Sequence, residues 1–284
     1  MTDQIDEFES MFKRAEREMF SYVDIPIETV AVVTDGAQDA CQRVRTDLVA
    51  FQPRLESVTN WRMITGSDYN NVGELLEQVN QDRTDLIVTY RHLHEKAPIP
   101  QHSLGVYLDV LTQMTTIPVL VLPGTAMAPG SLTGRVCNRV MVVTDHISGD
   151  SRLINYGARM CIAGGTVWLC HVEDDLTFRR YLEAIGRIPD IATDQAEQLI
   201  DQQLIKDAGD FIETCIQELN ENGPHALYQS EVQRGHHLRV YRDMIDAHDI
   251  DLLVTNTKDE GQLAMHGTTY SLSIELLDVS MLLL

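Results

Sequence analysis

Two loops of the 284-residue chain hold the side chains best suited to bind an anion. The first loop, residues 90–96, contains Arg91, two histidines and a lysine, and is basic enough to attract one. The second loop, residues 256–261, contains Lys258, which could meet a phosphate, but two acidic residues follow it directly. Two like charges about 5 Å apart repel by roughly 3 kcal/mol at an effective dielectric of about 20. These acids oppose an anion unless they turn outward or hold Mg²⁺.

Other chemistry-bearing patterns are weaker. His92, His94 and His102, with Glu95 nearby, could suggest a metal site, but the spacing is not that of a zinc site. Histidines in a polar loop are usually just solvated. The sequence contains no G-x-S-x-G elbow, Walker lysine or Cys–His pairing of a recognised signature. It therefore predicts no catalytic residues and no metal site, and indicates a binding protein rather than a dedicated enzyme.

The elements that must position these loops occur twice along the chain. Residues 85–89 and 251–255 are apolar runs typical of buried strands, and each precedes a loop, a glycine and a helical run. The opening glycine and the Pro or Ser of the final strand are equally spaced, 118 − 105 = 13 and 280 − 267 = 13. Strand-type runs ending in aspartate, at 29–35 and 140–145, begin the two copies. Such internal repeats indicate a domain duplication.

The second copy is longer than the first. The aspartates at 35 and 145 are 110 residues apart and those at 85 and 251 are 166 apart, which leaves 166 − 110 = 56 extra residues. We assign these to a second strand at 166–172, a loop, and a long helix at 193–222 that a Gly-Pro pair ends. A strand at 226–232 then matches residues 61–65 of the first copy. The first copy is thus expected to lack the second strand and the long helix.

Strands alternating with helices predict an α/β fold, a mostly parallel sheet with helices on both faces. Residues 2–22 have apolar side chains every three or four positions, which predicts an amphipathic helix. That helix either packs on its own or a neighbouring subunit or docks on another protein. We divide the chain into this N-terminal helix (1–26), a shortened first domain (27–124), a linker rich in Pro, Gly and small residues (125–134), and a second domain (135–284).

Charge and composition exclude several classes of partner. The chain has 43 acidic and 22 basic residues, a net charge of −21, so its field opposes nucleic acids and anionic membranes. The N-terminus lacks the basic start and apolar core of a signal peptide, and no run approaches the roughly 18 apolar residues of a membrane helix. Five cysteines without a CxxC pair are typical of reduced thiols. We expect a cytoplasmic protein with no nucleic-acid partner and no membrane insertion.

In order and spacing, these motifs resemble the universal stress protein family, and the whole chain resembles its tandem members. The resemblance rests on the strand ends at Asp35 and Asp145, the run 168–172, and the helices opened by Gly105 and Gly267. It covers the chain except the N-terminal helix and the linker. It implies two Rossmann-like domains, each an open, mostly parallel sheet with helices on both faces.

The resemblance also implies a nucleotide site in the second half. ATP-binding members carry Gly-x2-Gly-x9-Gly-Ser/Thr after the fourth strand, and its glycines let the backbone approach phosphates at a helix start. The first-strand aspartate and the second-strand backbone hold the adenosine. Carried over by position, the predicted site residues are Asp145, Val172, Asn256, Lys258, Gly267, Thr268 and Thr269. Because Asn256 and Asp259 replace the first two glycines, a mononucleotide or no nucleotide is an open alternative.

The first half matches the pattern less well. Tyr90 and Leu93 stand at its glycine positions, and Val106 replaces the hydroxyl residue. Its weaker candidate residues are Asp35, Arg91, Ser103 and Gly105.

The resemblance implies a cytoplasmic stress-response regulator or sensor that binds an adenine nucleotide (ATP, ADP or AMP), with or without Mg²⁺, and at most hydrolyses ATP weakly. The alternative is a non-nucleotide interaction module that docks on and regulates another protein, such as a transporter or a kinase. Domains of the family pair through their last strands. We therefore expect the two halves to pair with each other through theirs, and a homodimer or a partner protein beyond that.

Overall fold

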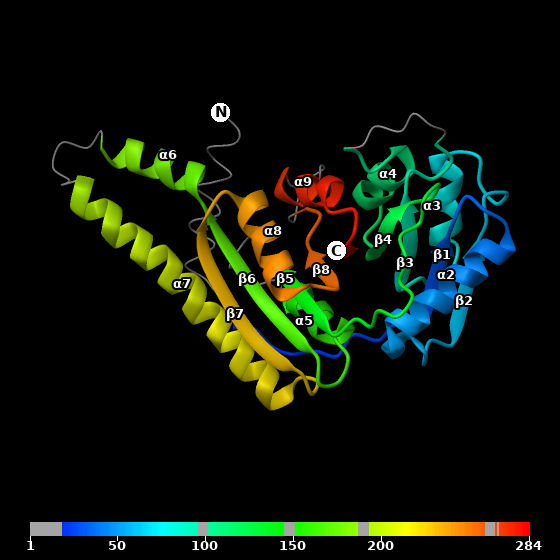
Figure 1. Ribbon diagram of the computed structural model, residues 1–284, viewed down its shortest axis with the longest axis horizontal. Helices are drawn as coiled ribbons and strands as arrows, with labels where there is room; N and C mark the ends of the chain where they lie inside the picture. The colour runs from blue at the N-terminus through cyan, green and yellow to red at the C-terminus, as the bar shows by residue number, and fades with distance from the viewer. Residues whose placement is uncertain (1–18, 96–101, 145–150, 187–192, 259–264, 266) are drawn as a thin grey trace.

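The computed structural model describes residues 19–95, 102–144, 151–186, 193–258, 265 and 267–284. The described strands form one nine-stranded sheet in the order β2-β1-β3-β4-β9-β8-β5-β6-β7 (Figure 1). Neighbouring strands are parallel throughout except for β4 and β9, which are antiparallel. The predicted α/β class with a mostly parallel sheet is therefore confirmed.

The elements follow the predicted order closely. Those of the first half are β1 (Thr29–Val33), α2 (Gln38–Phe51), the 3-10 helix η1 (Pro53–Leu55), β2 (Asn60–Ile64), α3 (Val72–Asn80), β3 (Leu86–Arg91), α4 (Val106–Met114) and β4 (Val119–Thr125). Those of the second half are β5 (Arg139–Val143), α5 (Ser151–Met160), β6 (Thr166–Asp174), α6 (Asp175–Ile185), α7 (Thr193–Asn222), β7 (Leu227–Gly235), α8 (His237–His248), β8 (Leu252–Thr255), α9 (Gly267–Glu275) and β9 (Ser280–Leu283).

One aspartate in each half fixes the start of the neighbouring strand. Asp85 Oδ2 accepts a hydrogen bond from the backbone N–H of Thr29, the first residue of β1, at 2.9 Å. Asp251 Oδ2 accepts one from the backbone N–H of Arg139, the first residue of β5, at 3.0 Å. The matched aspartates of the sequence repeat thus make matched contacts, as a duplication requires.

The second-strand position of the first half is filled, contrary to our prediction. We matched residues 61–65 with residues 226–232, the segment of β7. Instead, β2 pairs with β1 as β6 pairs with β5, and β7 lies outside β6. The first half therefore lacks the edge strand and the long helix, and it retains the second strand. A short apolar run carries no signal of which strand it will hydrogen-bond to, so only the pairing reveals its place.

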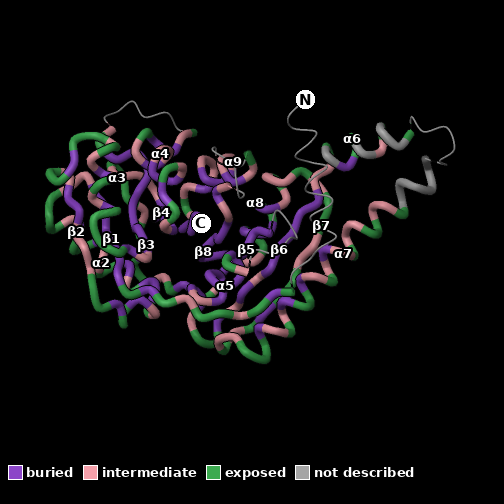
Figure 2. The backbone as a smooth tube through the Cα atoms, turned by 180° about the vertical axis from the view of Figure 1, so that it is seen from behind, coloured by how far each residue is buried: buried purple, intermediate pink, exposed green. Residues whose placement is uncertain are grey.

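The core has two layers because alternate strand residues point to opposite faces of the sheet. Helices α2, α5 and α7 cover one face, and α3, α4, α8 and α9 cover the other. Figure 2 shows the buried strands between these more exposed helices. Each layer contains strand residues of both halves: Val32 and Val142 lie in one, Val33 and Val143 in the other. The hydrophobic core is thus continuous across the two halves.

The halves join through their last strands. Val119, Leu120 and Val121 of β4 pair with residues 281–283 of β9 in antiparallel register. The predicted intramolecular pairing is therefore confirmed. It also buries what would otherwise be two apolar strand edges, which are prone to aggregate.

Three segments differ from prediction or lie beyond the description. Helix α6 occupies part of the stretch we assigned to a loop, and Asp174 Oδ1 accepts a hydrogen bond from the backbone N–H of Leu176 at its start. Most of the predicted N-terminal helix, residues 1–18, lies outside the described residues. Residues 19–28 form neither helix nor strand, so the expected helix does not extend to residue 22. Strand β4 reaches Thr125, the first residue of the predicted linker.

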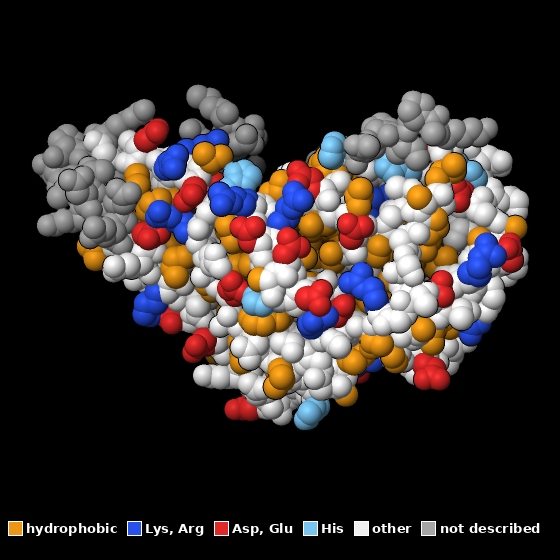
Figure 3. Space-filling view, viewed as in Figure 1, with side chains coloured by type: hydrophobic (Ala, Val, Ile, Leu, Met, Phe, Trp, Pro, Cys, Tyr) orange, Lys and Arg blue, Asp and Glu red, His pale blue; other side chains and the backbone are white. Residues whose placement is uncertain are grey.

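The surface mixes charges of both signs. On the face in Figure 3, basic side chains alternate with acidic ones over the second half. No helix among the described residues is long and apolar enough to cross a membrane. Nor does that part of the chain group three or more His, Cys, Asp or Glu side chains in a way that could hold a metal ion.

Candidate functional site

The candidate site lies at the carboxyl ends of the second-half strands. Parallel α/β sheets bind ligands beyond the carboxyl ends of their strands, at the point where the connections that leave two adjacent strands run in opposite directions. In this sheet that point lies between β5 and β8. Val172 lies near the end of β6, Asn256 directly follows β8, and Gly267 begins α9. Asp145, the predicted partner of the adenosine, lies outside the described residues, as do Asp259 and Glu260.

A histidine that we did not predict links two of the predicted residues. His237 Nε2 lies 2.8 Å from the backbone oxygen of Val172, and His237 Nδ1 lies 3.2 Å from Thr268 Oγ1. Since a carbonyl oxygen only accepts, Nε2 must carry the proton that it donates to Val172. Asp174 Oδ2 lies 3.9 Å from Nδ1 on the same side. The structure thus brings Val172 and Thr268 together around one imidazole ring.

The backbone N–H of Val172 is also engaged. It donates to the hydroxyl oxygen of Tyr241, a buried residue of α8, at 3.2 Å. The rings of His237 and Tyr241 stack with their centroids 6.0 Å apart. Both backbone groups that were expected to hold a base therefore have partners from α8. A ligand that uses them must replace these two side chains.

The start of α9 is anchored to the end of β8 by the side chain of Thr269. Thr269 is fully buried, and its hydroxyl donates to the backbone oxygen of Asn256 at 2.7 Å and lies 3.1 Å from Thr255 Oγ1. This hydroxyl therefore positions the helix on β8. Among the described residues, a Cβ added at Gly267 would meet no atom within 4 Å.

The two cations that we predicted to meet a phosphate both donate hydrogen bonds to backbone oxygens of the other half. Lys258 Nζ donates to the backbone oxygen of Gln113, near the carboxyl end of α4 in the first half, at 2.7 Å. Arg91 donates from Nε to Ser273 O and from Nη2 to Leu276 O, both at 3.0 Å, at the carboxyl end of α9 in the second half. Cations are favourable at helix carboxyl ends, where carbonyl groups lack partners. Each half thus supplies a cation to a helix of the other half.

Arg91 is fully buried in this contact. Burial lowers the pKa of its guanidinium to about 10, so the group stays charged at neutral pH. Nη1 donates a third bond to the backbone oxygen of Leu122 at 3.3 Å, and Nη2 also lies 3.6 Å from Met281 Sδ. The basic loop that we interpreted as an anion site therefore contributes its arginine to the junction between the halves.

A side chain of the protein fills the anion position of the first half. Glu95 Oε1 accepts a hydrogen bond from the backbone N–H of Val106, the first residue of α4, at 2.7 Å. Its other oxygen, Oε2, lies 2.7 Å from His92 Nδ1. Gly105 has φ 82°, and a Cβ there would lie 2.8 Å from Glu95 Oε1, so only glycine allows this close approach. The carboxylate takes the place that a ligand phosphate would need.

Other side chains at the carboxyl ends of the first-half strands also contact one another. Asp35 Oδ2 accepts a hydrogen bond from the backbone N–H of His94 at 3.2 Å. The rings of Tyr69, His94 and Tyr107 pack against one another with centroids 4.8 to 5.5 Å apart. Ser103 is half-buried, two residues before the helix-opening glycine. The structure therefore gives none of the four first-half candidates a clear ligand-facing role within the described residues.

Replacing Glu95 with glutamine tests this internal capping. We expect the free energy of unfolding to fall by about 1 to 2 kcal/mol, because the charge at the α4 start and its contact with His92 are lost. Urea unfolding followed by circular dichroism measures the change. Glu77→Gln, on the exposed side of α3, is the control and should leave stability unchanged. Equal losses in the two variants would contradict the assignment.

The sequence contained partial signals of the residues we missed. His237 and Tyr241 lie four residues apart, so they occupy one face of the helix that follows β7. Glu95 lies in the loop after β3, and its partner Val106 is eleven residues further along the chain. No spacing rule within a helix or strand predicts a contact over that distance. All five cysteines are buried and free, and burial raises the pKa of each thiol, so none resembles a reactive thiolate.

Comparisons with known proteins bear on the fold. Neither a protein-family model nor a curated protein sequence matches the chain. Among solved structures, a functionally unknown protein from Pseudomonas aeruginosa PAO1 is 13% identical with a TM-score of 0.53, over 91% of this chain and 92% of that one. A proposed universal stress protein from Pseudomonas aeruginosa UCBPP-PA14 is 13% identical with a TM-score of 0.52, over 91% of this chain and 93% of that one. The chain thus has the universal stress protein fold.

Proposed function

We propose that the chain is a stress-response regulator of the universal stress protein family whose second half binds an adenine nucleotide. One observation carries the proposal: Val172 O and Thr268 Oγ1 lie within hydrogen-bond distance of the same imidazole ring. The strand end expected to hold a base and the helix start expected to hold a phosphate therefore border one space. A ring of the protein with polar nitrogen atoms occupies part of that space.

The contacts of α8 imitate the edge of an adenine base. His237 donates a hydrogen bond to Val172 O, as the exocyclic amino group of adenine would. The Tyr241 hydroxyl accepts one from Val172 N, as a ring nitrogen of adenine would. An adenine can therefore satisfy the same two backbone groups once these side chains move aside. No atom of the described residues lies within 4 Å of a Cβ built at Gly267, and the N–H groups and dipole of the α9 start favour a phosphate there.

The first half, in this proposal, is a structural partner and binds no nucleotide. Glu95 already supplies a carboxylate to the start of α4. We therefore expect one nucleotide per chain, with or without Mg²⁺.

Native mass spectrometry of freshly purified protein, with extraction of bound nucleotide, tests the proposal. We expect AMP, ADP or ATP at close to one per chain, and weaker binding in Asp145→Ala and Gly267→Val. Gly209→Val on α7 is a matched control, because a Cβ at that position would also meet no atom within 4 Å. Affinities that stay at the wild-type value in both site variants would rule out this site.

A second candidate function is a protein-docking module that uses no nucleotide. It is favoured by the intramolecular partners of the predicted ligand groups, namely Val172 N and O, Lys258 and Arg91. A protein that is purified empty, and that gains no thermal stability from millimolar nucleotide with Mg²⁺, would support this candidate. Sedimentation of the full chain and of a chain lacking residues 1–18 would then test whether that segment mediates a homodimer.

A further inference from the structure

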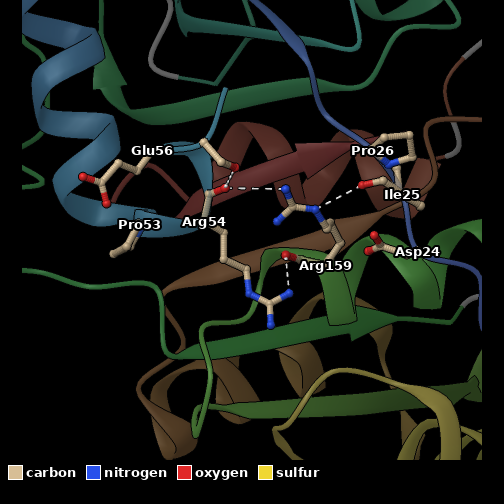
Figure 4. Close-up of a pocket in the computed structure, with 8 residues that line it drawn as sticks. Asp24, Ile25, Pro26, Pro53, Arg54, Glu56 and Arg159 are labelled. Atoms are coloured by element: carbon tan, nitrogen blue, oxygen red, sulfur yellow. Dashed lines mark hydrogen bonds between the residues drawn. The ribbon is translucent and has the colours of Figure 1, made fainter. Parts of the chain in front are cut away.

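A cavity of about 570 Å³ lies near the amino ends of the strands, whereas the candidate nucleotide site lies at their carboxyl ends. Three segments line it: residues 24–26 before β1, residues 53–57 around η1, and Arg159 near the end of α5. All three precede or lead into the amino ends of strands. The cavity therefore lies where the N-terminal segment, the first half and the second half meet (Figure 4).

Two arginines dominate the wall of this cavity. Arg54 Nη1 donates to the backbone oxygen of Arg159 at 3.2 Å, and Arg159 Nη2 donates to that of Arg54 at 3.5 Å. Arg159 Nε also donates to Ile25 O at 3.0 Å. These contacts hold the two side chains in place and use only part of the N–H donors that two guanidinium groups carry.

No carboxylate in the described part of the chain forms an ion pair with either arginine of this pair, whereas Arg43, Arg139 and Arg234 each have one. Burial and the nearby Arg54 charge both lower the pKa of Arg159. Two cations are therefore held close together in a partly buried position.

Two acids also line the cavity, and their placement matters. Figure 4 shows the Glu56 carboxylate turned away from both guanidinium groups. Asp24 lies nearer to Arg159, and its Oδ1 accepts a hydrogen bond from the Tyr22 hydroxyl at 3.4 Å. Asp24 offsets part of the positive charge. We therefore expect the site to prefer an anion whose oxygens match the guanidinium donors over an anion attracted by charge alone.

We propose that this cavity binds an oxyanion, a phosphate or carboxylate group of a small ligand, between Arg54 and Arg159. The planar fork of a guanidinium matches two oxygens of either group. Because the walls come from the N-terminal segment and both halves, a bound oxyanion links all three. The site is separate from the nucleotide site at the carboxyl ends of the strands.

Isothermal titration calorimetry of the full chain tests the proposal. Inorganic phosphate and malonate are titrated separately at constant ionic strength, with chloride as the reference, so the two arms distinguish the phosphate from the carboxylate source. We expect saturable binding of at least one anion. Arg54→Gln and Arg159→Gln should each weaken it tenfold or more. Arg45→Gln is the control, because its guanidinium packs over the Trp61 ring, 5.1 Å from the centroid.

Three further variants keep the test decisive. Arg54→Lys retains the charge without the fork, so it should fold and bind more weakly than wild type. Gly209→Val, on α7 and away from both sites, is a control that should leave this binding unchanged. Gly267→Val tests whether the anion binds instead at the start of α9. Absence of saturable binding to the wild-type chain would overturn the proposal. So would variants with native circular dichroism that bind as wild type does, or loss of binding in Gly267→Val alone.

Discussion

Replacing Arg91 with methionine is expected to lower the free energy of unfolding by about 3 kcal/mol. The substitution removes the donor for three backbone oxygens, those of Leu122, Ser273 and Leu276, and all three residues are buried. Each buried acceptor left without a donor costs about 1 kcal/mol or more. Methionine fills a similar volume and removes the desolvation cost of the guanidinium, which keeps the net loss near this value.

The chain provides a tryptophan in each half to follow this loss. Trp61 lies in β2 and Trp168 in β6, so variants with a single tryptophan report the two halves separately during urea unfolding. We expect the Arg91 substitution to destabilise both halves, because the arginine joins them. Arg43→Met is the control, since this exposed arginine pairs with Asp39 one helical turn away. A native-like midpoint for Arg91→Met would show that the contact contributes little.

Replacing His237 with alanine is expected to raise the affinity of the second half for an adenine nucleotide by about tenfold. The two ring nitrogens of the imidazole contact Val172 O and Thr268 Oγ1, so a ligand that uses these atoms must first break those hydrogen bonds. Two hydrogen bonds with net values near 1 kcal/mol each correspond to about a tenfold to thirtyfold change in the dissociation constant. Titration of nucleotide into the wild-type and variant chains measures the difference.

Neighbouring variants separate this competition from a general effect. His236→Ala changes the exposed histidine just before α8 and should not alter the affinity. Tyr241→Phe removes the hydroxyl that accepts from Val172 N, and should raise the affinity as His237→Ala does. A fall in affinity in His237→Ala would mean that the imidazole contacts the ligand directly and does not compete with it. Absence of binding in every variant would favour the docking function.

The sequence determined the elements of this protein because local patterns encode them. The apolar runs at β1, β3, β5 and β8 predict buried strands, and Asn222, Gly223 and Pro224 predict the end of α7. The equal spacing of the two copies predicted the duplication, and the family resemblance implied the pairing of β4 with β9 that the structure shows. The resemblance also predicted a ligand site at the carboxyl ends of the second-half strands.

Tertiary structure alone decided what the polar side chains do. Arg91 and Lys258 have the right chemistry for an anion, yet their partners are carbonyl groups 182 and 145 residues away, at the ends of α9 and α4. The partners of Val172 come from α8, 65 and 69 residues further along the chain. The pattern of apolar residues within one segment determines whether that segment forms a helix or a strand. A hydrogen bond between distant segments depends instead on how the helices pack on the sheet. Residue type and spacing therefore predicted the fold, and the packing of the two halves decided which of the predicted site residues have partners within the protein.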